Sequence, residues 1–303
     1  MAVYVVGDFL RETRLRKGYT QEEVSYGICT PASLSRIENG AQKPGRLILE
    51  KLFERLGTEN NLFNSFVSRE DMELYSAIQE LIRNITDKDV LKIETQIRIV
   101  EKMIKETSGL EHQCLYFAKG ELARQRDKNS EKAMELYMNA IHITLPEFDG
   151  KNPLRNNLLT FDEIMIINAI AILYGENEQS MIAIKLDMWL KEYMENKIID
   201  GKMKIAKYPM ILNNLSYWFG GNKCHREALQ MANEGVDFCI KYGNLATFPN
   251  QILNKGVALA ELGDFDTAKI YLHQAITILQ AMKKEDTAQF VIAWCRNHYL
   301  VEF

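Results

Sequence analysis

The sequence predicts an all-α protein with a small helical head and a longer array of paired helices. Three observations support this prediction. Residues 20–40 have the pattern of two short helices joined by a tight turn. Beyond residue 69 there is hardly any strand-like alternation, and glycine and proline recur at intervals of about one helix. Alanines also recur at comparable places along this second part, as expected for repeated helix pairs.

The first predicted helix, Val6 to Lys17, supports the two that follow. Phe9, Leu10 and Thr13 lie near one face of it, and Gly18 ends it. We therefore expect this helix to pack against the next two through that face.

Residues 20–40 carry strong helix-boundary signals. Thr20 is a good N-cap, followed by polar and acidic residues in the first turn. Thr30 and Pro31 start a second helix, because proline is tolerated at the first helical position, and Gly40 ends it. Leu34 and Ile37 face inward in this second helix, which leaves a polar outer face. Two helices at this spacing form the arrangement that enters a DNA major groove.

The head ends in a loop and a further helix. Residues 41–46 are predicted as loop and Ile48 to Leu56 as an amphipathic helix closed by Gly57. Three apolar residues then complete the small core: Leu62, Phe63 and Phe66. We place the end of the head between residues 60 and 68, which gives domains 1–66 and 67–303.

These motifs resemble the helix-turn-helix domain of the Cro and phage-repressor (XRE) family. The resemblance covers Gly7 to Gly57 and depends on Gln21-Glu22-Glu23, on residues 34–40 (LSRIENG) and on Pro44. It implies a five-helix, lambda-repressor-like domain. It also implies a structural ion pair between Arg14 and Glu38, although Arg14 facing solvent or a phosphate is an alternative. Residues 27–30 form a turn one residue shorter than the commonest form, similar to the Rgg and PlcR group.

Docking geometry divides the expected DNA contacts into two kinds. Ser33 and Arg36 face outward on the second helix and are expected at base edges, where Arg36 can bind guanine bidentately. Gln21, Lys43 and Arg46 are expected at phosphates. Two residues are intermediate: Ser35 and Asn39. The alternative for Arg36 is an ordinary surface charge. So small a domain is expected to bind an inverted-repeat operator as a homodimer.

The remainder is predicted as eleven helices, whose expected ranges are 71–84, 88–107, 110–126, 130–143, 161–174, 179–196, 206–219, 226–242, 248–262, 265–283 and 286–300. The clearest repeat unit runs from Ile252 to Leu279 and has the spacing of a tetratricopeptide repeat. Marker alanines at 133, 183, 228 and 268 are separated by 50, 45 and 40 residues. These spacings exceed the usual ~34 residues, so the repeats are degenerate and are expected to form a right-handed, TPR-like α-solenoid. Lys255 occupies a position that is usually apolar.

A head of this kind followed by such repeats resembles the layout of the Rgg, PlcR and ComR (RRNPP) regulators. The resemblance implies a cytoplasmic, DNA-binding transcription regulator whose repeats bind a short signalling peptide in quorum sensing. An alternative is a regulator whose repeats serve only dimerisation or binding of a protein partner, without a peptide ligand.

A peptide site would need amide side chains that both donate to and accept from a peptide backbone. Asn214 and Asn254 each lie fourteen residues before a marker alanine and are therefore in equivalent positions. The full predicted set is Asn168, Tyr208, Asn213, Asn214 and Asn254. The alternative is that these asparagines bridge adjacent repeats and that the aromatic residues pack between helices.

Composition limits the remaining functional classes. The net charge of −4 argues against indiscriminate nucleic-acid binding, although residues 1–66 hold nine Lys and Arg against eight Asp and Glu. The five scattered cysteines suit a reducing compartment, and neither a signal peptide nor a membrane span is expected. The five histidines form no metal-binding motif, and no nucleotide-binding glycine pattern appears. We therefore expect no enzyme, no cofactor and no metal.

Overall fold

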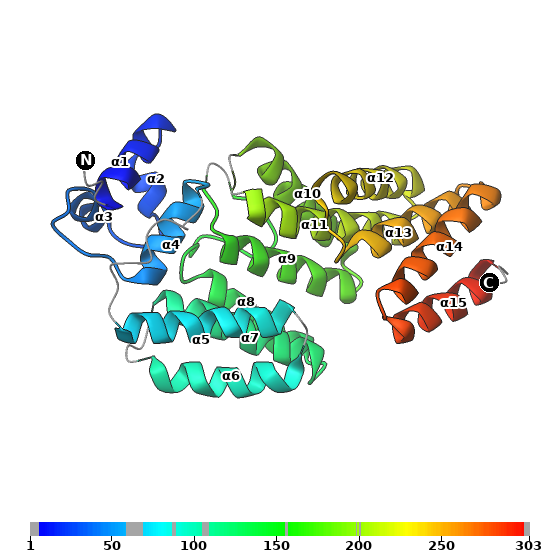
Figure 1. Ribbon diagram of the computed structural model, residues 1–303, viewed down its shortest axis with the longest axis horizontal. Coiled ribbons are helices and arrows are strands. Elements are labelled where there is room, and N and C mark those ends of the chain that lie inside the picture. Colours follow the sequence, from blue (N-terminus) through cyan, green and yellow to red (C-terminus); the bar gives the residue numbers. More distant parts are fainter. Residues whose placement is uncertain are drawn as a thin grey trace. The chain divides into compact units, whose positions relative to one another are not determined.

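The computed structural model describes residues 6–58, 69–86, 89–104, 109–154, 157–197, 199 and 201–299. Within these ranges it contains fifteen helices and no strand (Figure 1). The predicted all-α fold, a helix-turn-helix head followed by TPR-like repeats, is confirmed. Leu62, Phe63 and Phe66, which were expected to complete the head, lie outside the described residues.

The chain divides into two compact units. The first comprises Met1–Asn177 with Lys197–Asp200, and the second comprises Glu178–Asn196 with Gly201–Phe303. The head therefore shares one compact unit with the first helix pairs. The predicted domain boundary after residue 66 falls among residues that are not described.

The head consists of four described helices. These are α1 (Val6–Arg16), α2 (Gln21–Ser25), α3 (Pro31–Glu38) and α4 (Arg46–Arg55). Their inner faces form one core, whose buried members include Leu10, Val24, Leu34, Leu52 and Phe53. The apolar spacing of each helix therefore places α2 and α3 on a common support.

Five further helices complete the first unit. They are α5 (Arg69–Thr86), α6 (Val90–Met103), α7 (Leu110–Gln125), α8 (Ser130–Ile141) and α9 (Phe161–Glu176). Figure 1 shows α5 beside α6 and α7 beside α8, the paired arrangement of a helical repeat.

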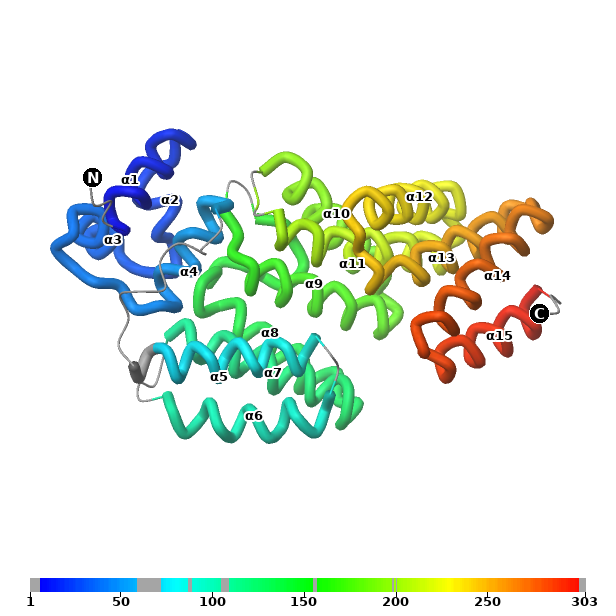
Figure 2. Tube along the Cα trace, viewed as in Figure 1, coloured from blue at the N-terminus to red at the C-terminus, as the bar shows by residue number. Residues whose placement is uncertain are grey.

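Six of the described helices belong to the second unit. They are α10 (Ser180–Asn196), α11 (Gly201–Gly221), α12 (His225–Tyr242), α13 (Phe248–Glu261), α14 (Phe265–Ala281) and α15 (Glu285–Tyr299). The tube in Figure 2 shows α13 and α14 side by side. The helix α11 begins five residues earlier than the predicted start at 206 and continues through Pro209.

Small residues permit the close packing of the repeat helices, as the spacing predicted. All four marker alanines are buried. A methyl group added at Gly256 on α13 would lie 2.9 Å from a Leu272 side-chain carbon on α14. Lys255, the departure from the motif, places its ammonium 4.2 Å from the ring centroid of Tyr271.

No helix in the described ranges combines the length and the apolar character that crossing a membrane requires.

Candidate nucleic-acid interface

The helices α2 and α3 both begin at a threonine cap. Thr20 Oγ1 accepts from the Glu23 amide at 3.1 Å, and Glu23 Oε2 accepts from the Thr20 amide at 2.7 Å. This capping box fixes the start of α2 and lowers the pKa of Glu23 through the hydrogen bonds from Thr20. Thr30 Oγ1 accepts from the Ser33 amide at 3.1 Å, with Pro31 as the first residue of α3. Local sequence therefore determines where the second helix begins.

A buried ion pair joins α1 to α3. Arg14 Nε donates to Glu38 Oε1 at 2.7 Å, and Arg14 Nη2 donates to Glu38 Oε2 at 2.9 Å. This hydrogen-bonded Glu38 carboxylate raises the pKa of Arg14. Gln21 Nε2 also donates to Glu38 Oε2 at 2.7 Å, which brings α2 into the same network. The three helices are thus held by one carboxylate, and bidentate bonds of this kind specify their angles.

The outer face of α3 carries a pre-arranged arginine. Arg36 is exposed, its Nε donates to Gln42 Oε1 at 3.0 Å, and its Nη2 donates to Ser33 Oγ at 3.2 Å. Asn39 and Lys43 are also exposed, on the last turn of α3 and in the following loop. Ser35 is partly buried beside this face. The predicted base-contacting residues Ser33 and Arg36 therefore lie together, and Gln42 is an orienting partner that the sequence did not single out.

Two of the predicted phosphate contacts are arranged differently from the expectation. Arg46 is the first residue of α4 and is 7% exposed, with its guanidinium 5.0 Å from the ring centroid of Tyr75. Its side chain is therefore packed on an aromatic ring and does not extend into a surface loop, which corrects the predicted role. The side-chain amide of Gln21 donates to Glu38 Oε2, as described above, so this side chain belongs to the network that joins the helices of the head.

Two of the predicted peptide-binding amides of the second unit, Asn213 and Asn254, contact each other. Asn254 Nδ2 on α13 donates to the Asn213 carbonyl at 3.2 Å and to Asn213 Oδ1 at 3.1 Å, on α11. Both residues are half-buried, as is the neighbouring Asn214. Asn213 and Asn254 therefore bridge adjacent repeats, which was the alternative interpretation of the recurring asparagines.

The other two predicted ligand residues are buried. Tyr208 is 3% exposed, and its hydroxyl contacts Glu195 at 2.6 Å and also contacts Glu234. Asn168 lies on α9 in the first unit and is 5% exposed. Burial against neighbouring helices cannot be inferred from the spacing of either residue along its own helix.

Comparison with known proteins gives matches for the head and for the whole chain. Residues 5–66 match the family model described as a helix-turn-helix domain. Over 63 residues the chain is 38% identical to the uncharacterized HTH-type transcriptional regulator YqaF of Bacillus subtilis (strain 168). That alignment covers 20% of this chain and 83% of the relative.

Two solved structures resemble the chain along almost its full length. The crystal structure of Bacillus thuringiensis PlcR in complex with the peptide PapR7 and DNA has a TM-score of 0.62 at 16% identity, covering 96% of this chain and 99% of that one. A putative transcriptional regulator from Listeria monocytogenes EGD-e has a TM-score of 0.50 at 14% identity, covering 99% of each chain. At these identities the likeness shows a shared fold.

Proposed function

Because the chain belongs to the family of HTH-type transcriptional regulators, we propose that it binds an inverted-repeat DNA operator as a homodimer through α3. The observation that supports this most is the exposed face of α3, where Arg36 is held between Ser33 and Gln42. A guanidinium with fixed orientation loses little freedom on binding guanine, and such a contact discriminates by about 1–3 kcal/mol. Asn39 extends the same face, and Lys43 adds a phosphate contact.

Selection from a pool of random DNA duplexes tests this part of the proposal. The native chain is expected to enrich an inverted repeat whose half-sites are about one helical turn apart. Failure to enrich any sequence would refute it. Because the proposed target is DNA, the proposed site of action is the cytoplasm.

We further propose that the repeat helices of the second unit bind a short peptide that controls DNA binding. Two observations support this: the fold is shared with PlcR, whose crystal structure contains a peptide, and amides recur on adjacent helices at Asn213, Asn214 and Asn254. A bound peptide can replace the hydrogen bonds between Asn254 and Asn213, because its backbone offers the same kinds of donors and acceptors.

A titration with a library of short synthetic peptides, read by thermal shift, tests peptide binding. A ligand that binds only the folded chain raises the melting temperature, and the stabilisation grows with the logarithm of one plus the ratio of ligand concentration to dissociation constant. The response is expected to disappear in Asn254→Ala, while the exposed control Asn250→Ala retains it. No response from the native chain across the library would favour the alternative, in which the repeats serve only dimerisation or a protein partner.

A further inference from the structure

The first turn of α9 is tied to the head through Glu163. Glu163 closes the capping box of α9, since its Oε2 accepts from the Thr160 amide at 2.5 Å. Its Oε1 accepts from Arg55 Nη2 on α4 at 2.7 Å, and the two side chains are 0% and 1% exposed. Each carboxylate oxygen therefore has its own partner, one within α9 and one in the head.

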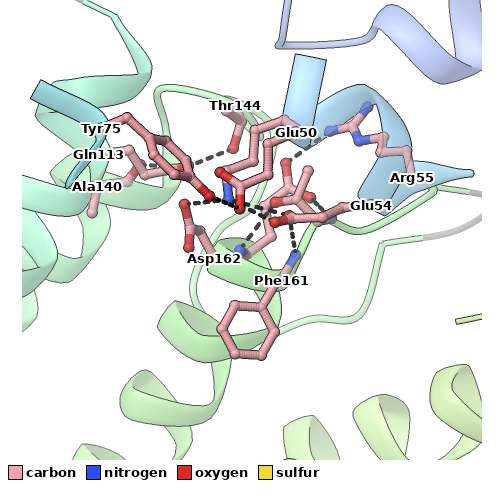
Figure 3. Close-up of polar contacts among 12 residues, drawn as sticks. Glu50, Glu54, Arg55, Tyr75, Gln113, Ala140, Thr144, Phe161 and Asp162 are labelled. Atoms are coloured by element: carbon pink, nitrogen blue, oxygen red, sulfur yellow. Dashed lines mark hydrogen bonds and ion pairs between the residues drawn. The ribbon is translucent and has the colours of Figure 1, made fainter. Parts of the chain in front are cut away.

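A second set of bonds joins the same two helices, with a cation on α4 that contacts α9 and a carboxylate on α4 that accepts from α9. Lys51 on α4 contacts Asp162 on α9 at 2.9 Å and Glu54 at 2.9 Å, and its side chain is 3% exposed. Glu54 in turn accepts from the Phe161 amide at 2.9 Å, which caps the start of α9. Figure 3 shows Glu54, Arg55 and Asp162 with these bonds. We call the five residues Lys51, Glu54, Arg55, Asp162 and Glu163 the α4–α9 latch.

Two further contacts hold the head against the repeat helices. Any side chain at Gly27, in the turn before α3, would lie 2.1 Å from the carbonyl oxygen of Thr144. Thr144 is itself held by Gln113 Nε2 on α7, at 2.7 Å (Figure 3). Leu110 and Leu158 belong to the apolar core of the head. The head is therefore docked on α7, on α9 and on the residues that join α8 to α9.

The latch fixes the orientation of the head, whereas the apolar part of this contact contributes mainly to its stability. The hydrophobic effect is non-directional, whereas buried, charge-assisted hydrogen bonds require particular distances and angles. Such pairs contribute little net stability compared with apolar replacements, but they fix orientation. Arg55 extends the fixed contact to α2, since its Nη1 donates to the Glu23 carbonyl at 3.4 Å.

We propose that Asp162 and Glu163 are positioning residues for DNA binding, which hold the head at the angle that α3 needs to read an operator. This inference builds on the proposed DNA binding of α3. Neither residue belongs to the helix-turn-helix or touches its exposed face. They act through Lys51 and Arg55, so a change in α9 is transmitted to α2 and α3.

The proposal predicts a difference between one half-site and a complete operator. A single half-site requires only a folded head, whereas two half-sites at fixed spacing require both heads of a dimer at the correct angle. A loosened but folded head therefore retains half-site binding and loses affinity for the complete operator. A head that is merely destabilised loses both.

The experiment compares Asp162→Asn and Glu163→Gln with the native full-length chain. Glu135→Gln is the matched control, because it neutralises an exposed carboxylate that pairs with Lys132 on α8, remote from the latch. Affinity is measured for duplexes that carry one or two half-sites of the selected sequence. Amide hydrogen exchange over α2 and α3 is measured without DNA.

Both latch variants are expected to lower affinity for the complete operator by about tenfold or more, to keep half-site affinity within about twofold, and to speed exchange in α2 and α3. The control is expected to behave as the native chain. If Glu163→Gln unfolds the head, Asp162→Asn decides, since its carboxylate is 14% exposed and less of the packing depends on it.

Unchanged operator affinity and unchanged exchange in Asp162→Asn would overturn the positioning role. A parallel loss of half-site and operator binding would also overturn it, because the latch would then act only on stability. A native chain that binds no duplex would refute the proposed function instead, while the exchange measurement would still decide whether the latch orders the head.

Discussion

Asn244 Nδ2 donates to the Ile205 carbonyl at 2.7 Å, and this carbonyl is the one that Pro209 leaves without a helical partner. A helical carbonyl normally accepts from the amide four residues later, and proline has none. The side chain from beyond α12 replaces that missing donor, so α11 continues through the proline. Gln251 Nε2 adds a bond to the Pro209 carbonyl at 2.6 Å, from α13.

Removing this donor should destabilise the second unit. Asn244→Ala is expected to cost about 1–3 kcal/mol, because the Ile205 carbonyl then lacks a partner. The cost should shrink in a Pro209→Ala background, where residue 209 supplies the amide itself. Denaturation followed by tryptophan fluorescence measures this cycle, since all three tryptophans (Trp189, Trp218 and Trp294) lie in the second unit. Equal costs in both backgrounds would contradict the explanation.

Removing one partner of the Arg14–Glu38 pair should destabilise the head strongly, whereas replacing both partners by apolar residues should change its stability little. Glu38→Leu leaves the Arg14 guanidinium buried without its carboxylate, which is expected to destabilise the head by about 3–5 kcal/mol. The double change Arg14→Leu with Glu38→Leu should recover most of that loss. Circular dichroism reports unfolding of all the helices and tryptophan fluorescence reports the second unit alone, so an earlier transition seen only by circular dichroism belongs to the first unit. A double variant no more stable than Glu38→Leu would argue against this account.

Alanine substitutions at two glycines distinguish the effect of backbone strain from the effect of a steric clash. Gly27 and Gly40 have φ of +68° and +72°, so alanine at either position is strained to a similar degree. Only at Gly27 would the added carbon lie against Thr144. Gly27→Ala is therefore expected to destabilise the chain by about 1–3 kcal/mol more than Gly40→Ala in urea denaturation. Equal losses would show that the turn does not dock on the residues after α8.

The latch should make stability depend on pH through Glu54. Burial raises the pKa of Glu54 to about 7 from its ordinary 4.5, and Asp162 and Glu50 add to the rise while Lys51 opposes it. Tyr75 packs beside these carboxylates, and its hydroxyl donates to Glu50 Oε1 at 3.1 Å. The folded chain thus holds this proton more tightly than the unfolded chain. The stabilisation from the protonated Glu54 carboxyl is complete below pH 4.5 and is lost as the pH rises through about 7.

Denaturation from about pH 5 to about pH 8 measures this dependence. The native chain is expected to lose up to about 3 kcal/mol over that range. Glu54→Gln should flatten the profile, because the amide does not titrate and still accepts from the Phe161 amide. The exposed-carboxylate control Glu135→Gln should keep the native slope. A native slope retained in Glu54→Gln would assign the effect to another group.

Local signals predicted the head well. The Thr20 and Thr30 caps, the Pro31 start and the inward Leu34 and Ile37 depend on residues within a few positions of one another. The structure has all of them. The eleven later helices were also predicted close to their observed bounds, since glycine, proline and capping residues mark their ends.

Apart from the Arg14–Glu38 pair, which the family resemblance implied, contacts between residues far apart in the sequence could not be predicted. Arg55 and Glu163 are 108 positions apart, and nothing in either segment indicates that the two will pair. The same reason explains Arg46, which was expected in a surface loop and is packed on Tyr75 of a later helix. The predicted start of α11 at residue 206 was five residues late, because its sequence alone does not show that the distant Asn244 supplies a donor to the Ile205 carbonyl.

The central claim is that the exposed face of α3 reads DNA, and Arg36→Ala tests it most directly. The Arg36 side chain is exposed and among the described residues its side-chain hydrogen bonds go to Ser33 and Gln42, so its removal should leave the melting temperature unchanged. Binding of the duplex selected by the native chain is measured by fluorescence anisotropy at fixed salt. We expect affinity for that duplex to fall by about tenfold to a hundredfold, while affinity for unrelated duplexes changes little. Native affinity for the selected duplex in a folded Arg36→Ala chain would contradict the claim.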